Sequence, residues 1–357
     1  MIQIRIMKFN DFCMGFYIFK VSVLSGIQRK MSMKEQILGL LKAYPDYVSG
    51  QDICEQLGVS RTAIWKNINA LKNEGYHIDS VNNRGYKLLS EPDVMEEKRI
   101  REYLHTKWIA KNIWYQTETD STNTQAKRMG EDGAPNGTLV ITERQTAGKG
   151  RRGKSWVSPM GNCYFSVLLR PEISVDRASM ITLVSALALA KTIKETEALD
   201  TMIKWPNDVI ANGKKLCGIL TESSTDLEYI NYAVVGIGIN TNQIEFPDEI
   251  KDMASSIRLE TGNKINRAKL LGTFLNVFEV YYEKFLETED LSILLEEYNH
   301  FLVNCGKEVK IIEKEQERIL TAIGVDSRGR LIVEDKNGQR ETIMSGEVSV
   351  RGLYGYV

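Results

Sequence analysis

Residues 34–90 hold the pattern that most constrains the fold, because three short helices and a hairpin follow one another with clear boundaries. Ser49 and Ser60 are typical helix caps, and Gly58 is a typical helix stop. A polar tip then separates two apolar strands. The order helix, helix, tight turn, helix and hairpin predicts a winged helix-turn-helix domain. The predicted elements are helices at 34–44, 49–58 and 60–75 and strands at 76–81 and 86–89.

Positive charge is concentrated on the third of these helices. Arg61, Lys66 and Lys72 lie there, and no acidic residue occurs between Ser60 and Asn73. The formal net charge of -1 excludes a polycation that binds nucleic acid by bulk attraction, so any DNA contact must come from such a local patch. The alternative is a winged helix that binds protein and has a solvated basic face. The predicted DNA contacts are Ser60, Arg61, Thr62, Trp65, Lys66 and, at the hairpin tip, Arg84.

Residues 1–30 differ in character from the rest. An apolar stretch runs from Phe12 to Ile27, but it is shorter than the about 20 residues that a spanning helix needs, and Lys20 interrupts it. A signal peptide is less easily excluded, although a DNA-reading module has no role outside the cell. We expect residues 1–30 to be a non-family extension, or sequence upstream of a true start at Met31 or Met33.

Composition indicates a globular protein without a disulfide framework. The chain of 357 residues is 43% hydrophobic and 26% charged, which excludes disordered, collagenous and multispan membrane proteins. Its five cysteines are far apart and form no CxxC pair, so neither disulfides nor a zinc ribbon is predicted. We therefore expect a cytoplasmic protein that does not associate with a membrane.

Strands and helices alternate between a short linker at 91–93 and about residue 300, which predicts an α/β domain of enzyme size. Strand-like apolar runs fall at 137–142, 164–169, 203, 216–222 and 232–239, and helical patterns at 123–130, 177–197 and 267–287. A charged helix is expected at 94–105. The tail then changes to short strands with Gly and Asn turns, for which a small β-barrel is the simplest closure. The predicted division of the chain is an extension at 1–30, a winged helix-turn-helix at 31–91, a catalytic domain at 92–302 and a β domain at 303–357.

The loop at 148–154 carries the densest chemical signal, because three glycines alternate with four cations. Such a loop brings backbone N–H groups and positive charge to a phosphate chain. Residues 148–155 also satisfy the P-loop pattern, but Pro159 and Gly161 follow where that motif requires a helix, so we reject this reading. The alternative is a solvated basic surface loop.

Three further clusters favour a ligand site over a plain surface loop. The first cluster consists of small polar residues at 120–123. The second, at 204–208, contains a cation, an aromatic ring, an amide and a carboxylate. The third, at 214–222, has two lysines at the start of a buried strand. The three histidines lie outside every cluster, and no metal or nucleophile motif occurs. The pattern therefore favours charge stabilisation of a phosphate-bearing substrate over covalent catalysis.

The motifs GKGRRGKSWVSP, DSTN, KWPNDV, KKLCGILTE, VVGIGIN and SGEVSVRG, in this order, resemble those of the bifunctional biotin protein ligases that are also biotin operon repressors. The resemblance covers about residues 33–357. It implies an α+β multidomain protein with a winged helix-turn-helix, a central α/β ligase domain with a mixed sheet, and a small C-terminal SH3-like β-barrel.

This resemblance implies a biotin-[acetyl-CoA-carboxylase] ligase that joins biotin to ATP as biotinyl-5'-AMP. The biotinyl group then passes to a lysine of the biotin carboxyl carrier protein, and the ligand-loaded homodimer binds operator DNA. By motif position, Arg151 and Lys215 are catalytic and Asp208 helps to bind Mg²⁺. The implied biotin contacts are Ser121, Thr122, Asn123, Gln145, Lys149, Gly150, Arg151 and Lys215. The implied ATP or adenylate contacts are Trp156, Asn207, Asn240 and Arg351.

One position departs from the family, since Lys149 stands where Arg is common. The charge is kept but a planar bidentate contact is lost, so retention of biotinyl-AMP could differ. Two rival functions stay open at this point: a ligand-sensing DNA-binding repressor without ligase activity, and a related ligase that attaches lipoate.

Overall fold

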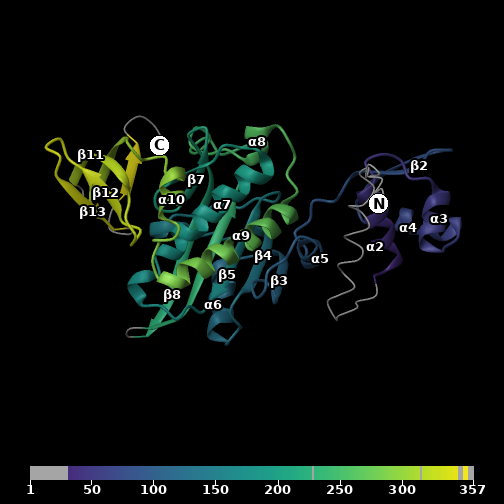
Figure 1. The fold of residues 1–357 in the computed structure, drawn as a ribbon, viewed down its shortest axis with the longest axis horizontal. Coiled ribbons are helices and arrows are strands. Elements are labelled where there is room, and N and C mark those ends of the chain that lie inside the picture. The colour runs from purple at the N-terminus through teal and green to yellow at the C-terminus, as the bar shows by residue number, and fades with distance from the viewer. Residues whose placement is uncertain (1–30, 227–228, 314–315, 345–348, 353–357) are drawn as a thin grey trace, which may run out of the picture. The chain divides into compact units, whose positions relative to one another are not determined.

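A computed structural model of the chain describes residues 31–226, 229–313, 316–344 and 349–352, and its ribbon is drawn in Figure 1. The chain divides into two compact units, the first ending at Pro92 and the second beginning at Asp93. The predicted extension at 1–30 lies outside the described residues.

The first unit has the predicted order of elements. Ser32, Ser49 and Ser60 cap its helices through their side chains, and Gly58 ends the second helix in the left-handed conformation. Leucine and isoleucine side chains from all three helices form its core. The winged helix-turn-helix prediction is therefore confirmed for its elements. They are α2 (Met33–Ala43), α3 (Gly50–Leu57), α4 (Arg61–Asn73), β1 (His77–Val81) and β2 (Gly85–Ser90).

A seven-stranded mixed sheet organises the second unit, in the order β3-β4-β5-β9-β8-β7-β6. Only β3 and β4 pair in parallel, and the other neighbours are antiparallel. The central strands are almost entirely buried, which explains why their sequences were recognisable as apolar runs. The strands are β3 (Ile113–Thr119), β4 (Thr138–Gln145), β5 (Cys163–Leu169), β6 (Met202–Lys204), β7 (Asp208–Ala211), β8 (Lys214–Asp226) and β9 (Tyr229–Ile239).

Helices cover both faces of this sheet. The alternation of side chains along β8 shows this, because Thr221 contacts Thr182 of α7 whereas Glu222 contacts Asn123 of α6. Helix α9 packs against α7 (Figure 1). The charged helix expected at 94–105 is shorter than predicted, since only Glu97–Arg101 is helical. The helices are α5 (Glu97–Arg101), α6 (Thr122–Glu131), α7 (Met180–Glu197), α8 (Ile257–Thr261), α9 (Arg267–Thr288) and α10 (Leu295–Phe301).

The C-terminal strands form a small antiparallel sheet in the order β13-β12-β11-β10-β14. Among the residues that the structure describes, no pairing between β13 and β14 closes it, so the sheet is confirmed and the barrel is not. Before this sheet begins, Leu302 at the end of α10 forms an isolated parallel bridge with Ile203 of β6. The strands are β10 (Glu308–Glu313), β11 (Gln316–Val325), β12 (Leu331–Glu334), β13 (Arg340–Ile343) and β14 (Ser349–Gly352).

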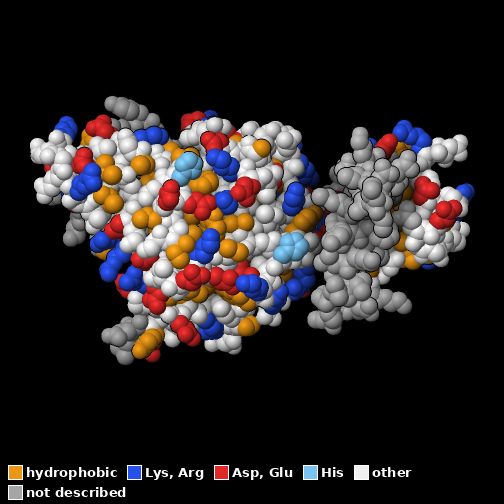
Figure 2. Space-filling model, viewed as in Figure 1, with side chains coloured by type: hydrophobic (Ala, Val, Ile, Leu, Met, Phe, Trp, Pro, Cys, Tyr) orange, Lys and Arg blue, Asp and Glu red, His pale blue; other side chains and the backbone are white. Residues whose placement is uncertain are grey.

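The surface shown in Figure 2 mixes acidic and basic side chains over the second unit, in keeping with the near-zero net charge. The positive charge of a candidate site must therefore come from particular residues. Among the described residues, no helix combines the length and the apolar character that crossing a bilayer requires.

Candidate ligand site and DNA interface

The end of β4 and the start of α6 hold the first group of predicted biotin residues. The Gln145 Oε1 atom accepts hydrogen bonds from the Thr122 backbone N at 2.9 Å and its Oγ1 at 3.3 Å. The Gln145 Nε2 atom donates to Ser158 Oγ at 2.9 Å. Ser121 precedes α6 and is buried. Gln145 therefore ties the start of α6 to Ser158, four residues after the glycine-rich loop.

Asn123 is buried and fully engaged with the protein. Its Oδ1 accepts from Ser166 Oγ at 2.7 Å, and its Nδ2 donates to Glu222 Oε2 at 2.9 Å and to the Leu220 carbonyl at 3.2 Å. A Cβ atom on Gly236 would lie 1.8 Å from Asn123 Oδ1, so only glycine leaves room for this amide. Through these hydrogen bonds Asn123 links α6 to β5 and β8 and supports the site. Its contact with biotin stays a prediction.

The glycine-rich loop folds back on itself. Lys149 forms an antiparallel bridge with Ser155, the Gly150 N donates to the Lys154 carbonyl at 2.7 Å, and Trp156 N donates to the Gly148 carbonyl at 2.9 Å. One turn of 3-10 helix occupies its tip, and no helix follows it among the described residues before β5 begins at Cys163. A P-loop would continue into an α-helix, so its rejection is correct.

Arg151 and Lys215 both reach the KWPND segment. The Arg151 Nη1 atom donates to Asn207 Oδ1 at 2.8 Å, and Lys215 Nζ lies 2.6 Å from Asp208 Oδ1. Burial lowers the pKa of the Arg151 guanidinium, and the negative charge of Asp208 opposes that effect. An arginine keeps its charge at any physiological pH, so the loop brings a partly desolvated cation beside a lysine and a carboxylate.

The indole of Trp156 lies across a pair of glycines. Gly218 and Gly238 face one another on β8 and β9, and a Cβ on them would approach the indole to 2.8 Å and 2.5 Å respectively. Lys215 Nζ lies 5.2 Å from the centre of the Trp156 ring, within the range of a cation–π contact. The two glycines thus make a flat floor of backbone on which a planar ring fits. Trp156 Nε1 is buried without a hydrogen-bond partner there.

Some residues of the predicted clusters make their hydrogen bonds away from the glycine-rich loop and the Gly218–Gly238 floor. Trp205, whose aromatic ring suggested a ligand contact, is buried and donates from Nε1 to the Gly329 carbonyl at 3.0 Å, next to the C-terminal sheet. Asn240 donates from Nδ2 to the Ser255 carbonyl at 3.1 Å. Arg351 lies on β14, and its side chain falls outside the described part of the chain.

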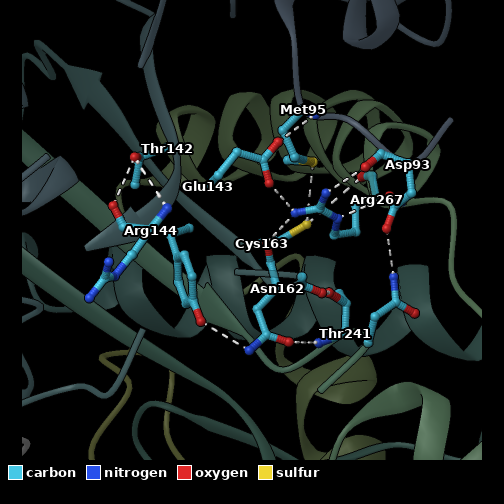
Figure 3. Close-up of polar contacts among 12 residues, drawn as sticks. Asp93, Met95, Thr142, Glu143, Arg144, Asn162, Cys163, Thr241 and Arg267 are labelled. Carbon is cyan, nitrogen blue, oxygen red and sulfur yellow. Dashed lines mark hydrogen bonds and ion pairs between the residues drawn. The ribbon is translucent and has the colours of Figure 1, made fainter. Parts of the chain in front are cut away.

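Sequence reasoning missed a buried ionic group behind the site, drawn in Figure 3. Arg267, at the start of α9, is ion-paired with Asp93 at 2.9 Å and with Glu143 of β4 at 2.5 Å. It also donates to the Asn162 carbonyl at 2.9 Å, while Asn162 Oδ1 accepts from Thr241 N. Buried charges of this kind need partners on every side. The group therefore fixes β4, two residues before Gln145, together with the segment after Asn240.

In the first unit the predicted DNA contacts line one exposed surface. Arg61, Thr62, Trp65 and Lys66 are exposed along α4, and the indole of Trp65 is 60% exposed. The Ser60 side chain caps α4 by accepting a hydrogen bond from Ala63 N, so one of the backbone N–H groups at this end of the helix is already occupied. The remaining N–H groups can bind an anion. Such exposure of a large aromatic ring beside cations is typical of a binding surface.

Family comparisons agree with this arrangement. Profiles of three families match the chain: an HTH domain at residues 34–87, the biotin/lipoate A/B protein ligase family at 115–240, and the biotin protein ligase C-terminal domain at 305–351.

Whole-chain relatives and solved structures are also similar. The bifunctional ligase/repressor BirA of Bacillus spizizenii is 34% identical over 325 residues, which cover 90% of this chain and 99% of that protein. BirA of Escherichia coli strain K12 is 30% identical, with 87% and 95% of the two chains covered. The biotin protein ligase from Aquifex aeolicus in complex with biotin and ATP has a TM-score of 0.60 at 32% identity, covering 68% of this chain and 99% of that one.

A helix-turn-helix unit joined to an α/β unit with a basic, glycine-rich loop defines a DNA-binding ligase. The chain belongs to the family of bifunctional biotin ligase/repressor proteins. It is a biotin protein ligase with a helix-turn-helix repressor function, and the reading as a repressor without ligase activity is not favoured.

Proposed function

We propose that the second unit catalyses both steps of biotin transfer with the residues described above. In the first step an oxygen of the biotin carboxylate attacks the α-phosphorus of ATP, forming biotinyl-5'-AMP and releasing pyrophosphate. In the second step the neutral amine of an acceptor lysine attacks the acyl carbon, an amide forms, and AMP leaves. The acceptor is the biotin carboxyl carrier protein of acetyl-CoA carboxylase.

The observation that carries the proposal is that Trp156 and Lys215 lie over the Gly218–Gly238 floor, while Arg151 and Lys215 contact the adjacent residues Asn207 and Asp208. Negative charge grows on the α-phosphate during attack, and the two cations can neutralise it. The folded loop keeps water from the mixed anhydride. On β9, Gly236 and Gly238 face the site, whereas Val235, Ile237 and Ile239 are buried in the core on the opposite face of the sheet.

The other roles in this proposal follow from motif position. Ser121, Thr122, Asn123 and Gln145 hold biotin, with Lys149 and Gly150 in the covering loop. The adenylate lies against Trp156, and Asn207, Asn240 and Arg351 contact the nucleotide. Support for the first group comes from the Thr122–Gln145–Ser158 chain of hydrogen bonds, which links the biotin residues to the segment just after that loop.

Asp208 fits a magnesium site in which the protein supplies a single carboxylate. Mg²⁺ at nucleotide sites is usually held by one or two carboxylates together with phosphate oxygens and water, and Asp208 supplies one carboxylate. That carboxylate is ion-paired with Lys215, so it would exchange this partner for the ion. When bound, Mg²⁺ would neutralise phosphate charge.

The first unit gives the protein its second activity. We infer that biotinyl-5'-AMP is the corepressor and that a ligand-loaded homodimer places two α4 helices on a palindromic operator, with Ser60, Arg61, Thr62, Trp65, Lys66 and Arg84 at the DNA. A cytoplasmic protein with domains at 31–91, 92–302 and 303–357 fits both activities. In this proposal the C-terminal strands close as an SH3-like barrel.

Biotin-dependent exchange of labelled pyrophosphate into ATP tests the proposed chemistry. We expect exchange by the wild-type protein with biotin and none with lipoate. Exchange with lipoate in place of biotin would identify the related lipoate-attaching activity. No exchange with either acid would contradict the proposal in favour of a sensor without catalysis.

A further inference from the structure

The segment between α2 and α3 is built directly against the wing, the β1–β2 hairpin. Val48 and Tyr86 of β2 exchange two backbone hydrogen bonds, each 2.9 Å long. Gly85 makes this approach possible, because a Cβ atom there would lie 2.0 Å from the Val48 carbonyl oxygen, and its φ of +108° also disfavours other residues. The neighbours of Val48 are consequently fixed beside the tip of the wing.

Tyr47 uses this position to place an aromatic ring under two cations. The guanidinium carbon of Arg84 lies 4.3 Å from the centre of the Tyr47 ring, and Lys87 Nζ lies 5.7 Å from it. The Tyr47 hydroxyl donates to Asp79 Oδ2 at 2.5 Å, which anchors the far end of the ring to β1. A cation within about 6 Å of an aromatic face is attracted to it. The ring is therefore a rigid platform for the wing arginine.

Asp46 supplies the negative charge that these cations face in the free protein. Its carboxylate oxygens lie 3.7 Å from Arg84 Nη2 and 3.6 Å from Lys87 Nζ. The side chains of Arg84 and Asp46 are 60% and 70% exposed, so solvent weakens the pair. A DNA phosphate can replace such a partner at little cost, whereas the contact with the Tyr47 ring is compatible with a phosphate on the outer side of the guanidinium.

We propose that Tyr47 is the positioning residue of the wing, holding the Arg84 guanidinium toward a DNA phosphate, and that Asp46 occupies the phosphate's place until DNA binds. This inference rests on the proposed DNA contact of Arg84. It adds the segment between α2 and α3 to a DNA-binding surface that otherwise consists of α4 and the wing.

The test measures binding of the full-length, ligand-loaded protein to a duplex selected by the wild-type protein from a random-sequence pool, over a range of salt concentrations. Tyr47→Leu should weaken binding about two- to fivefold, the range of an exposed cation–π contact, and lower the salt slope toward that of Arg84→Ala. Losing one phosphate contact lowers that slope by about 0.9. Tyr47→Phe keeps the ring and should retain the wild-type slope. Asp46→Asn should strengthen binding, most at low salt.

A double-mutant cycle separates positioning from general damage. If Tyr47 acts through Arg84, adding Tyr47→Leu to Arg84→Ala should cost little more than Arg84→Ala alone. Additive effects, or a Tyr47→Leu protein with an unchanged salt slope, would overturn the inference. Asp46→Asn tests it without touching the core of the unit, and weaker binding by that variant would also overturn it.

Failure of the inference differs from failure of the proposed contact. If Arg84→Ala leaves affinity and salt slope unchanged, Arg84 does not contact DNA and the inference falls with that proposal. If Arg84→Ala weakens binding and Tyr47→Leu does not, only the inference falls. Thermal unfolding and pyrophosphate exchange of each variant verify that both units are folded.

Discussion

Two cations of α4 have neutral hydrogen-bond partners, whereas the lysine of the ligand site has an acidic partner. On α4, Arg61 is hydrogen-bonded to Gln51 and Lys72 to Ser80, and these neutral partners leave the positive charge of both side chains available to phosphate. In the second unit Lys215 is paired with Asp208, and its ammonium lies near the Trp156 ring. The α4 cations can thus meet a phosphate directly, whereas Lys215 must exchange Asp208 for a ligand.

The largest expected effect is on the ligand site alone. Arg151→Ala removes a cation that faces the growing phosphate charge, and biotin-dependent pyrophosphate exchange should fall about 100- to 1,000-fold. Arg152→Ala is the matched control, since the neighbouring side chain is exposed, and it should change the rate far less. Equal losses in both variants would mean that the loop acts through bulk charge, as the α4 surface does.

The second prediction concerns the packing that supports the ligand site. Gly236→Ala would press a methyl group into Asn123 Oδ1, an amide held by Ser166, Glu222 and the Leu220 carbonyl. We expect a loss of about 1–3 kcal/mol in stability of the second unit and a raised KM for biotin. Gly39→Ala is the control, because nothing lies within 4 Å of its added Cβ. Unchanged thermal unfolding of Gly236→Ala would contradict the rigid scaffold.

A smaller effect is expected from the exposed charges of the first unit. Arg61→Ala should weaken DNA binding and reduce the salt slope by about 0.9, while Glu55→Ala on α3, an exposed acidic residue, should not reduce it. Filter binding of the ligand-loaded protein at several salt concentrations measures both. A salt slope that is the same in wild type and Arg61→Ala would remove Arg61 from the DNA surface.

The smallest effect is a pH dependence of the scaffold. Burial raises the pKa of Glu222, but hydrogen bonds from Lys127 and Asn123 outweigh it and lower the pKa from the ordinary 4.5. A lowered carboxyl pKa contributes stability above the unfolded-state value, and this stability is lost as pH falls through the folded-state value. The Tm difference between wild type and Glu222→Gln should therefore be constant above about pH 5 and shrink below about pH 4. A constant difference over this range would contradict the pairing.

Sequence patterns were sufficient for elements with a strong local signal. The capped helices of the first unit and the apolar runs in β5, β8 and β9 were predicted because caps and apolar runs are local features. Strand β3 was missed because its second half is polar and exposed, and β7 because it has four residues. The charged helix after the linker was overestimated, since charge alone does not place a helix end.

The residues of the candidate site also fall into those that local sequence motifs predicted and those that only the fold revealed. The glycine-rich loop and Lys215 stand in dense motifs and were found at once. Arg267 gave no signal, because its partners Asp93 and Glu143 lie 174 and 124 residues away in the sequence. The role of Trp205 was misjudged for the same reason, since its partner Gly329 belongs to the C-terminal sheet. Only the fold brings such pairs together.

The functional independence of the two basic sites is tested most directly by pyrophosphate exchange in a protein whose α4 cations have been replaced. In the double variant Arg61→Ala, Lys66→Ala, the account predicts wild-type rates of biotin-dependent exchange together with weakened operator binding. A fall in exchange that parallels the loss of DNA binding would contradict it, because the two sites would then depend on each other.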